Sequence, residues 1–341
     1  MIKEAIAKIV GGASLSMSEA EEIMTEIMQG KATSAQIGAF LIALRMKGET
    51  PSEIAGCARA MQRSAVQVKP RRRDLVDTCG TGGDSTGTFN ISTIAAFVVA
   101  GAGLFVAKHG NRSVSSRCGS ADLVEALGVN INLTAKQVAQ CIDEVGIGFL
   151  FAPSFHPTMK YAAPARQEIG LRTIFNLLGP LSNPAGAKRQ LLGVYKPELT
   201  ETVAEVLKAL GSEHAFVVYG ANGIDELSTS GVNKVVELHD RQIESFYLDP
   251  QELGLPRAKQ SELLGGDVAE NVAIARSILE GEEGPKKEVV LLNAAAALYI
   301  GGKVRDLSQG LKLAAEAVDS GQAREKLKEL ASLSQSLWRG K

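Results

Sequence analysis

The sequence predicts an α/β fold in which a small N-terminal α-helical domain precedes a larger α/β domain with a mostly parallel central sheet covered by helices. The first seventy residues carry helix-capping patterns and need no strand. Beyond them, short apolar runs alternate with helical segments, which is typical of a parallel sheet covered on both faces. With 341 residues, 45% of them hydrophobic and 22% charged, the chain is long enough for two globular domains.

Three helices are expected in the N-terminal segment because each is preceded by a capping pattern. The patterns are Ser18 with Glu21, Thr33 with Gln36, and Thr50 with Glu53, and Gly30 and Gly48 end the first two helices. Pro51 stands at the favoured first position of the third helix.

The α/β part is expected to contain short buried strands and a β-hairpin. The strands are LVDTC (75–79), LFVAKH (104–109), IGFLFA (147–152), QLLGVY (190–195), HAFVVYG (214–220) and VVLLN (289–293), and the hairpin is KVVELHDRQIESFYL (234–248). Helices are expected to begin at Asn90 and Ser120. The uncharged run 90–107 is interpreted as a buried helix followed by a buried strand, because it just falls short of a membrane span and contains polar residues.

The charge balance and the cysteine pattern limit the kinds of ligand and partner that are expected for this protein. With 37 basic and 38 acidic residues the formal net charge is −1, so neither nucleic acid nor a membrane is expected as a partner. The run KPRRR (69–73) resembles a nucleic-acid patch but has no aromatic partners, which favours a solvated linker. No CxxC pair exists and no histidine lies at zinc-ligand spacing, so the sequence supports neither a disulfide frame nor a zinc site, and the N-terminus is not expected to be a signal peptide. A cytoplasmic protein with reduced thiols is expected.

A glycine-rich stretch, DTCGTGGDSTGTFNIST (77–93), follows a predicted strand and precedes a predicted helix. Glycines expose backbone N–H groups, and a helix N-terminus adds partial positive charge, so the stretch suits a phosphate. It does not match a P-loop, and Ser85 stands where a dinucleotide fingerprint would need its third glycine. A tight turn that merely uses glycine is the alternative interpretation.

A second loop, KHGNRSVSSRCGSAD (108–122), also follows an apolar strand. Lys108, Arg112 and Arg117 supply positive charge, and its serines supply neutral donors, which together suit a pyrophosphate and a 5-phosphate. An exposed charged loop is the weaker interpretation, because the stretch continues directly from a buried strand.

Adjacent carboxylates, Asp225 and Glu226, follow the strand HAFVVYG. Such a pair alone is usually surface, but beside two phosphate loops it predicts a Mg²⁺ site. His109 is either a base or a hydrogen-bond donor, and His156 is expected to cap or pack. His214 and His239 have no partners in sequence, and no ordering of nucleophile and base predicts covalent catalysis.

These stretches resemble the anthranilate phosphoribosyltransferases. The resemblance rests on DTCGTGGDSTGTFNIST, KHGNRSVSSRCGSADLVEALGV, HPTMKYAAPARQEIGLRTIFNLLGPLSNPA and GIDELS, which occur in the family's order, and it covers nearly the whole chain. Cys118 is a minor departure, since a smaller residue is commoner there. The resemblance implies transfer of phosphoribosyl from 5-phosphoribosyl 1-diphosphate (PRPP) to anthranilate, with Mg²⁺ as the cofactor.

The resemblance also implies site residues, although it assigns no catalytic acid or base. The PRPP site would comprise Gly80, Gly83, Asp84, Thr88, Asn90, Ile91, Ser92, Thr93, Lys108, His109, Gly110, Asn111, Arg112, Ser113, Val114, Ser115, Ser116 and Ser120. Anthranilate would contact Gly80, Asn111 and Arg166, and the metal ligands would be Ser92, Asp225 and Glu226. The implied organisation is a helical domain, residues 1–70 joined in space by part of 165–185, and an α/β domain, 71–341, with a hinged cleft between them and a homodimer formed through the helical domain.

Two alternatives remain open at this point. A pyrimidine or thymidine phosphorylase shares the fold and a Lys-His phosphate loop, but it would not need the Asp225–Glu226 pair or RTIFNLLGPLSNP. A regulatory or nucleic-acid-binding relative would have lost phosphate or metal residues, and none is missing here.

Overall fold

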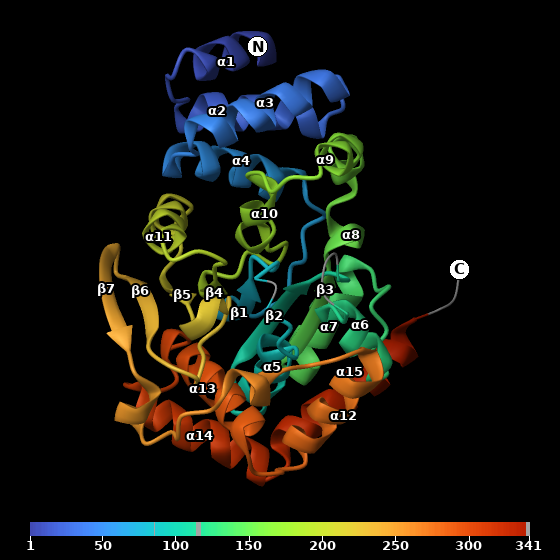
Figure 1. Cartoon of the computed structure of the whole chain (residues 1–341). Helices are drawn as coiled ribbons and strands as arrows, with labels where there is room; N and C mark the ends of the chain where they lie inside the picture. Colours follow the sequence, from blue (N-terminus) through green and yellow to red (C-terminus); the bar gives the residue numbers. More distant parts are fainter. Residues whose placement is uncertain (85, 114–116, 339–341) are drawn as a thin grey trace.

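The N-terminal helices lie at one end of the molecule, the C-terminal helices at the other, and the sheet lies between them (Figure 1). A computed structural model describes residues 1–84, 86–113 and 117–338. The N-terminal helices are α1 (Ile2–Val10), α2 (Met17–Met28), α3 (Ser34–Lys47) and α4 (Pro51–Ser64). The predicted helical character of this segment is confirmed.

Capping patterns place the starts of α3 and α4 correctly and the start of α2 incorrectly. Thr33 with Gln36 and Thr50 with Glu53 form reciprocal capping boxes, as predicted. The predicted box of Ser18 with Glu21 is wrong, because Ser16 and Glu19 cap α2. The capping pattern occurs twice within six residues, at Ser16 and at Ser18. The second cannot form the cap, because Glu21 is buried and pairs with Arg59 and Arg63 of α4.

The sheet of the described residues has seven strands in the order β3-β2-β1-β4-β5-β6-β7. The strands are β1 (Leu75–Gly80), β2 (Phe105–Gly110), β3 (Ile147–Phe151), β4 (Arg189–Gly193), β5 (His214–Tyr219), β6 (Asn233–His239) and β7 (Gln242–Leu248). Strands β1 to β5 are parallel, and β6 and β7 form the predicted antiparallel hairpin. The mostly parallel sheet is therefore confirmed.

Each face of the sheet packs against its own hydrophobic core, because successive strand residues point to opposite faces. Leu191 and Val218 belong to the core shared with the C-terminal helices. Leu192 and Val217 belong to the core shared with the N-terminal helices. A sheet buried on both faces explains why its strands are continuous apolar runs.

The remaining helices cover these two faces. They are α5 (Ile91–Gly101), α6 (Ser120–Ala126), α7 (Ala135–Val145), α8 (Ala152–Phe155), α9 (Ala163–Ile169), α10 (Phe175–Leu178), α11 (Leu199–Ala209), α12 (Val268–Leu279), α13 (Pro285–Ile300), α14 (Leu307–Asp319) and α15 (Gln322–Leu337). Short 3₁₀ turns are Pro157–Tyr161, Pro180–Ser182, Ala221–Gly223, Pro250–Leu253 and Gln260–Leu263. Helices α5 and α6 begin where the sequence predicts, and the run 90–107 contains α5 and the first residues of β2.

The predicted strand VVLLN is wrong, because these residues lie inside α13. Pro285 occupies the first turn of that helix, and nearly every residue from Val289 onward is buried. A helix buried on all sides has no polar face, so its apolar run has the same pattern as a buried strand.

Segments distant in sequence pack onto the N-terminal helices. Helix α9 packs against α3, and α10 and α11 pack against α4.

No helix in the described part of the chain is long and apolar enough to cross a membrane. The side chains of Cys57, Cys79, Cys118 and Cys141 are buried.

Candidate active site

The carboxylates of Asp225 and Glu226 lie in the turn after β5, at the carboxyl end of the parallel strands. This is where open α/β sheets bind ligands. The turn is tight: Gly220 N donates to Ile224 O at 2.8 Å, and Asn222 has a left-handed backbone with φ 62°. The turn brings both acids back over the strand ends, where Asp225 is buried.

Two hydrogen bonds join this acid pair to the glycine-rich loop and to the helix that follows it. Gly82 N donates to Asp225 Oδ2 at 2.7 Å. Ser92 N, in the first turn of α5, donates to Glu226 Oε1 at 2.7 Å. Three predicted parts of the site therefore meet at one place, although the acid pair is far from the other two in sequence.

Electrostatics at this place favour a bound cation. Burial raises the pKa of Asp225, and the nearby charge of Asp84 raises it further. Burial also raises the pKa of Glu226, and the charge of Asp225 adds to the shift. Burying like charges that are not offset costs free energy. A bound divalent ion would lower both the cost of burying the carboxylates and the repulsion between them.

The close approach of these segments depends on glycines at strand ends. A Cβ on Gly80 would lie 2.4 Å from Asp225 Oδ2, and a Cβ on Gly193 would lie 1.4 Å from Asp225 O. A Cβ on Gly220 would lie 2.1 Å from Glu226 O. Sequence reasoning found Gly80 but missed Gly193 and Gly220, whose only signal is a glycine at the end of an apolar strand.

The glycine-rich loop adopts conformations that side chains disfavour. Gly82, Gly83 and Gly87 have φ of 67°, 70° and 72°. Asp84 accepts a hydrogen bond from Thr86 Oγ1 at 2.6 Å, which holds its carboxylate near the acid pair. Gly265 N donates to Gly87 O at 2.9 Å, so segment 263–265, which no sequence motif marked, supports the loop from outside.

Hydrogen bonds connect the second loop to the first, and Asp122 connects residues within the second loop. Asn90 Nδ2 donates to Cys118 O at 3.2 Å, and Gly119 N donates to Asp122 Oδ2 at 2.9 Å. Arg112 forms ion pairs of 2.8 Å with both Asp122 and Glu125, so its charge is offset here. Val114, Ser115 and Ser116, predicted to wrap a phosphate, lie outside the described residues.

The chain matches two family models. Residues 3–65 match the glycosyl transferase family, helical bundle domain, and residues 72–324 match the glycosyl transferase family, a/b domain. The anthranilate phosphoribosyltransferase of Desulforamulus reducens is 53% identical, with 99% of this chain and 98% of that protein covered, and that of Moorella thermoacetica is 56% identical, with 97% and 98% covered. This chain belongs to the anthranilate phosphoribosyltransferase family.

Solved structures of anthranilate phosphoribosyltransferases share the fold. The enzyme of Thermus thermophilus superposes with a TM-score of 0.93 at 46% identity, covering 97% of this chain and 99% of that one. The enzyme of Saccharomyces cerevisiae, in complex with PRPP and Mg, superposes with a TM-score of 0.90 at 29% identity, covering 98% of each chain. The predicted family and fold are confirmed.

Within this phosphoribosyltransferase fold, Lys108 and its neighbours form a buried polar layer beneath the loops. Lys108 Nζ donates to Thr78 O, and its charge lies near the buried Asp77, whose carboxylate accepts from Asn183 Nδ2 at 2.8 Å. Burial lowers the pKa of His109 to about 3 and the pKa of His156 to about 4. Both imidazoles are therefore neutral near pH 7 and are weak proton acceptors.

Two arginines of segment 163–172 face aromatic rings. Arg166, the predicted anthranilate contact, stacks over Phe175 with its guanidinium carbon 4.9 Å from the ring centre. Arg172, which no sequence argument singled out, lies 4.2 Å from the centre of the Tyr195 ring. A Cβ on Gly83 would lie 2.4 Å from the Arg172 guanidinium, so Arg172 reaches the glycine-rich loop.

Proposed function

We propose that this chain transfers the phosphoribosyl group of PRPP to the amine of anthranilate. The products are N-(5-phosphoribosyl)anthranilate and pyrophosphate, in the second step of tryptophan biosynthesis from chorismate. The observation that carries the proposal is the pair of hydrogen bonds from Gly82 N to the buried Asp225 and from Ser92 N to the half-buried Glu226. They join a glycine-rich phosphate loop, a helix N-terminus and a cation-binding acid pair into one site.

The PRPP site is proposed at the glycine-rich loop, the start of α5 and loop 108–120. Among the described residues, Asn90 Oδ1 and Thr93 Oγ1 are buried polar atoms with no hydrogen-bond partner. Such atoms are rare in folded proteins and call for a partner such as a ligand. Their place at the start of α5, where N–H groups point outward, supports an anionic ligand there.

The acid pair fits Mg²⁺ by the chemistry of its donors. Mg²⁺ prefers one or two carboxylates together with substrate oxygens and water, and each of these carboxylates uses one oxygen to accept a backbone N–H. Asp225, Glu226 and Ser92 would hold the ion, which when bound offsets negative charge on the pyrophosphate leaving group.

The residues of the chain position and shield the reactants. Anthranilate's aromatic amine is largely neutral near pH 7, so it needs no strong base, in agreement with the low pKa values of His109 and His156. The loops bind the phosphates and exclude water from an oxocarbenium-like centre at C1 of the ribose. Gly80 and Asn111 are proposed to contact anthranilate, and Arg166 to meet its carboxylate with a planar two-pronged contact.

The division into domains 1–70 and 71–341 remains a proposal, supported by the packing of α9 and α10 onto α3 and α4. A cleft between the domains, closed by a hinge, would give anthranilate access from the side of Arg166. A homodimer through the helical domain is proposed on the family resemblance, and Val10 of α1 and Met46 of α3 are exposed apolar side chains on that domain.

The activity is measured by the fluorescence of anthranilate incubated with the protein, PRPP and Mg²⁺. We expect a PRPP-dependent loss of signal that stops when Mg²⁺ is chelated. Phosphorolysis of pyrimidine nucleosides without any loss of anthranilate would instead support the phosphorylase alternative. An unchanged anthranilate signal in the full mixture would reject the transferase function.

Replacing Arg166 by Ala is expected to raise the KM for anthranilate far more than the KM for PRPP. A charge-assisted two-pronged contact contributes about 1.5–3 kcal/mol, or roughly ten- to a hundredfold in binding. Arg166→Lys is the matched variant, because it keeps the charge and loses the planar contact, and we expect only partial recovery. Equal increases in both KM values would contradict the assignment of Arg166.

A further inference from the structure

A second group of metal-ligating side chains lies at the other end of β5 from the acid pair. It consists of His214, Glu237 and His239, whose ligand atoms all lie within 4.8 Å of one another. In sequence the two histidines have no partners, but antiparallel pairing of β5 with β6 sets them directly opposite each other. The group is separate from the site of Asp225 and Glu226, which follows the carboxyl end of β5.

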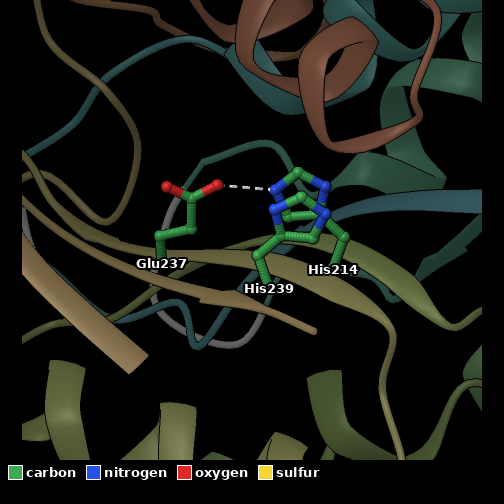
Figure 2. Close-up of side chains that lie close together, drawn as sticks. All are labelled: His214, Glu237 and His239. Carbon is green, nitrogen blue, oxygen red and sulfur yellow. Dashed lines mark hydrogen bonds and ion pairs between the residues drawn. The ribbon is translucent and has the colours of Figure 1, made fainter. Parts of the chain in front are cut away.

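The three donor side chains lie close together (Figure 2). The imidazole rings stack with centres 4.1 Å apart and planes at 8°, and each ring directs one nitrogen toward the Glu237 carboxylate. His214 Nε2 lies 2.7 Å from Glu237 Oε1. Tyr299 of α13 donates to the same oxygen at 3.1 Å, which orients the carboxylate from behind as outer-shell partners do at metal sites.

The surroundings are compatible with a cation. Arg189, the register partner of His214 on β4, is engaged by Glu213 and by Gly301 O, so its charge is offset. Asp240 Oδ2 lies 3.9 Å from His239 Nε2 and adds negative charge. His214 is 9% exposed and His239 is 54% exposed, so one ligand is fixed and the other is free to rotate onto an ion that enters from solvent.

We propose that His214, Glu237 and His239 bind a transition-metal dication of the Zn²⁺ class. Two imidazoles and one carboxylate are a typical donor set for Zn²⁺, with water completing the tetrahedron, whereas Mg²⁺ prefers oxygen ligands. When the metal takes Nε2 of a neutral His214, the imidazole proton resides on Nδ1, so no proton need be released. The ion connects β5 to β6 and, through Tyr299, to α13, and therefore stabilises the pairing of these two strands where β5 begins.

The test is titration of the purified full-length protein with Zn²⁺ in the presence of excess Mg²⁺, which occupies the hard carboxylate site. We expect one Zn²⁺ per chain and a rise in Tm with Zn²⁺ concentration, because the folded state alone presents the three ligands together. Binding should weaken in acid, because protons compete with the metal for its ligand atoms.

Variants separate this site from other zinc binding. His239→Ala should weaken Zn²⁺ binding by at least about tenfold, since removal of even an outer-shell partner costs roughly 10–100-fold. Tyr299→Phe should weaken it roughly tenfold. Gln242→Ala, which removes the exposed register partner of His239 and no metal ligand, should bind Zn²⁺ as the wild type does.

Activity with PRPP and anthranilate provides a check on folding, because His239→Ala should leave it unchanged. Visible absorption of the Co²⁺-loaded protein gives a second readout, with intense bands expected for the wild type and absent from His239→Ala. Zn²⁺ binding of equal affinity in the wild type and His239→Ala would overturn the proposal. So would the absence of binding to the wild type.

Discussion

Asp225→Asn combined with Glu226→Gln is expected to lower Mg²⁺-dependent turnover of PRPP by roughly 10²–10³-fold or more, the cost of removing a single preorganised electrostatic contact from an active site. Both amides keep an oxygen that accepts from Gly82 N and Ser92 N, so the loops remain in place. What the variant loses is the negative charge that we propose holds the ion. Steady-state rates across a Mg²⁺ titration measure the effect.

The matched control is Glu244→Gln, which neutralises an exposed carboxylate on β7 and should leave turnover unchanged. Wild-type turnover in the Asp225→Asn, Glu226→Gln variant would contradict the proposed metal site. A loss of turnover accompanied by a fall in Tm would indicate misfolding instead.

The same variant should be more stable than the wild type in metal-free buffer. The folded-state pKa values of Asp225 and Glu226 are raised by burial and mutual repulsion, so the folded state holds protons that the unfolded state releases. Their contribution to the free energy of unfolding is therefore present below the ordinary carboxyl pKa of about 4 and is lost as the pH rises through the raised values. Removing both charges should flatten this dependence, as measured by thermal unfolding at several pH values.

Gly193→Ala is expected to lower kcat by about 100-fold, the cost of misplacing reacting groups by about 1 Å. The added Cβ would lie 1.4 Å from Asp225 O, and a backbone atom cannot rotate away as a flexible side chain can. The turn that carries the acid pair must then shift. The same overpacking should destabilise the fold by about 1–3 kcal/mol.

Gly38→Ala is the control for this substitution, because a Cβ there meets nothing within 4 Å. Gly38 lies in α3, where Ala is the better helix former, so we expect unchanged kcat and equal or slightly higher stability. Urea unfolding together with steady-state kinetics distinguishes the two effects. A Gly193→Ala enzyme with wild-type kcat would show that Asp225 does not need its present position.

Capping and hydrophobic patterns predicted most of the secondary structure. They failed where one stretch of sequence fitted two structures equally well. Thr33 and Thr50 cap helices as expected, because one capping pattern stands before each apolar face. Two overlapping patterns stand before α2, and the burial of Glu21 against α4 decides between them. The apolar run VVLLN fits a buried strand and a helix buried on all sides equally well. Only its place inside α13 distinguishes the two.

The sequence predicted that the loops and the acid pair lie together at one edge of the sheet, but not the contacts that hold them there. The glycine-rich loop and the acid pair stand out because their residue types are unusual after apolar strands. The glycines that let them approach, Gly193 and Gly220, carry no such signal, and neither does Arg172 beside Gly83. Their roles depend on the carbonyl or guanidinium that packs against them, which belongs to another segment.

By itself, the sequence determined the fold class, the strand edge at which we propose that ligands bind, and the family, because periodicity, capping and motif chemistry are local properties of a chain. Only the tertiary structure decided which atoms meet: Gly82 with Asp225, Ser92 with Glu226, and His214 with His239. These contacts depend on strand order and register, which are set by the packing of both faces of the sheet at once and leave no short-range pattern in the sequence.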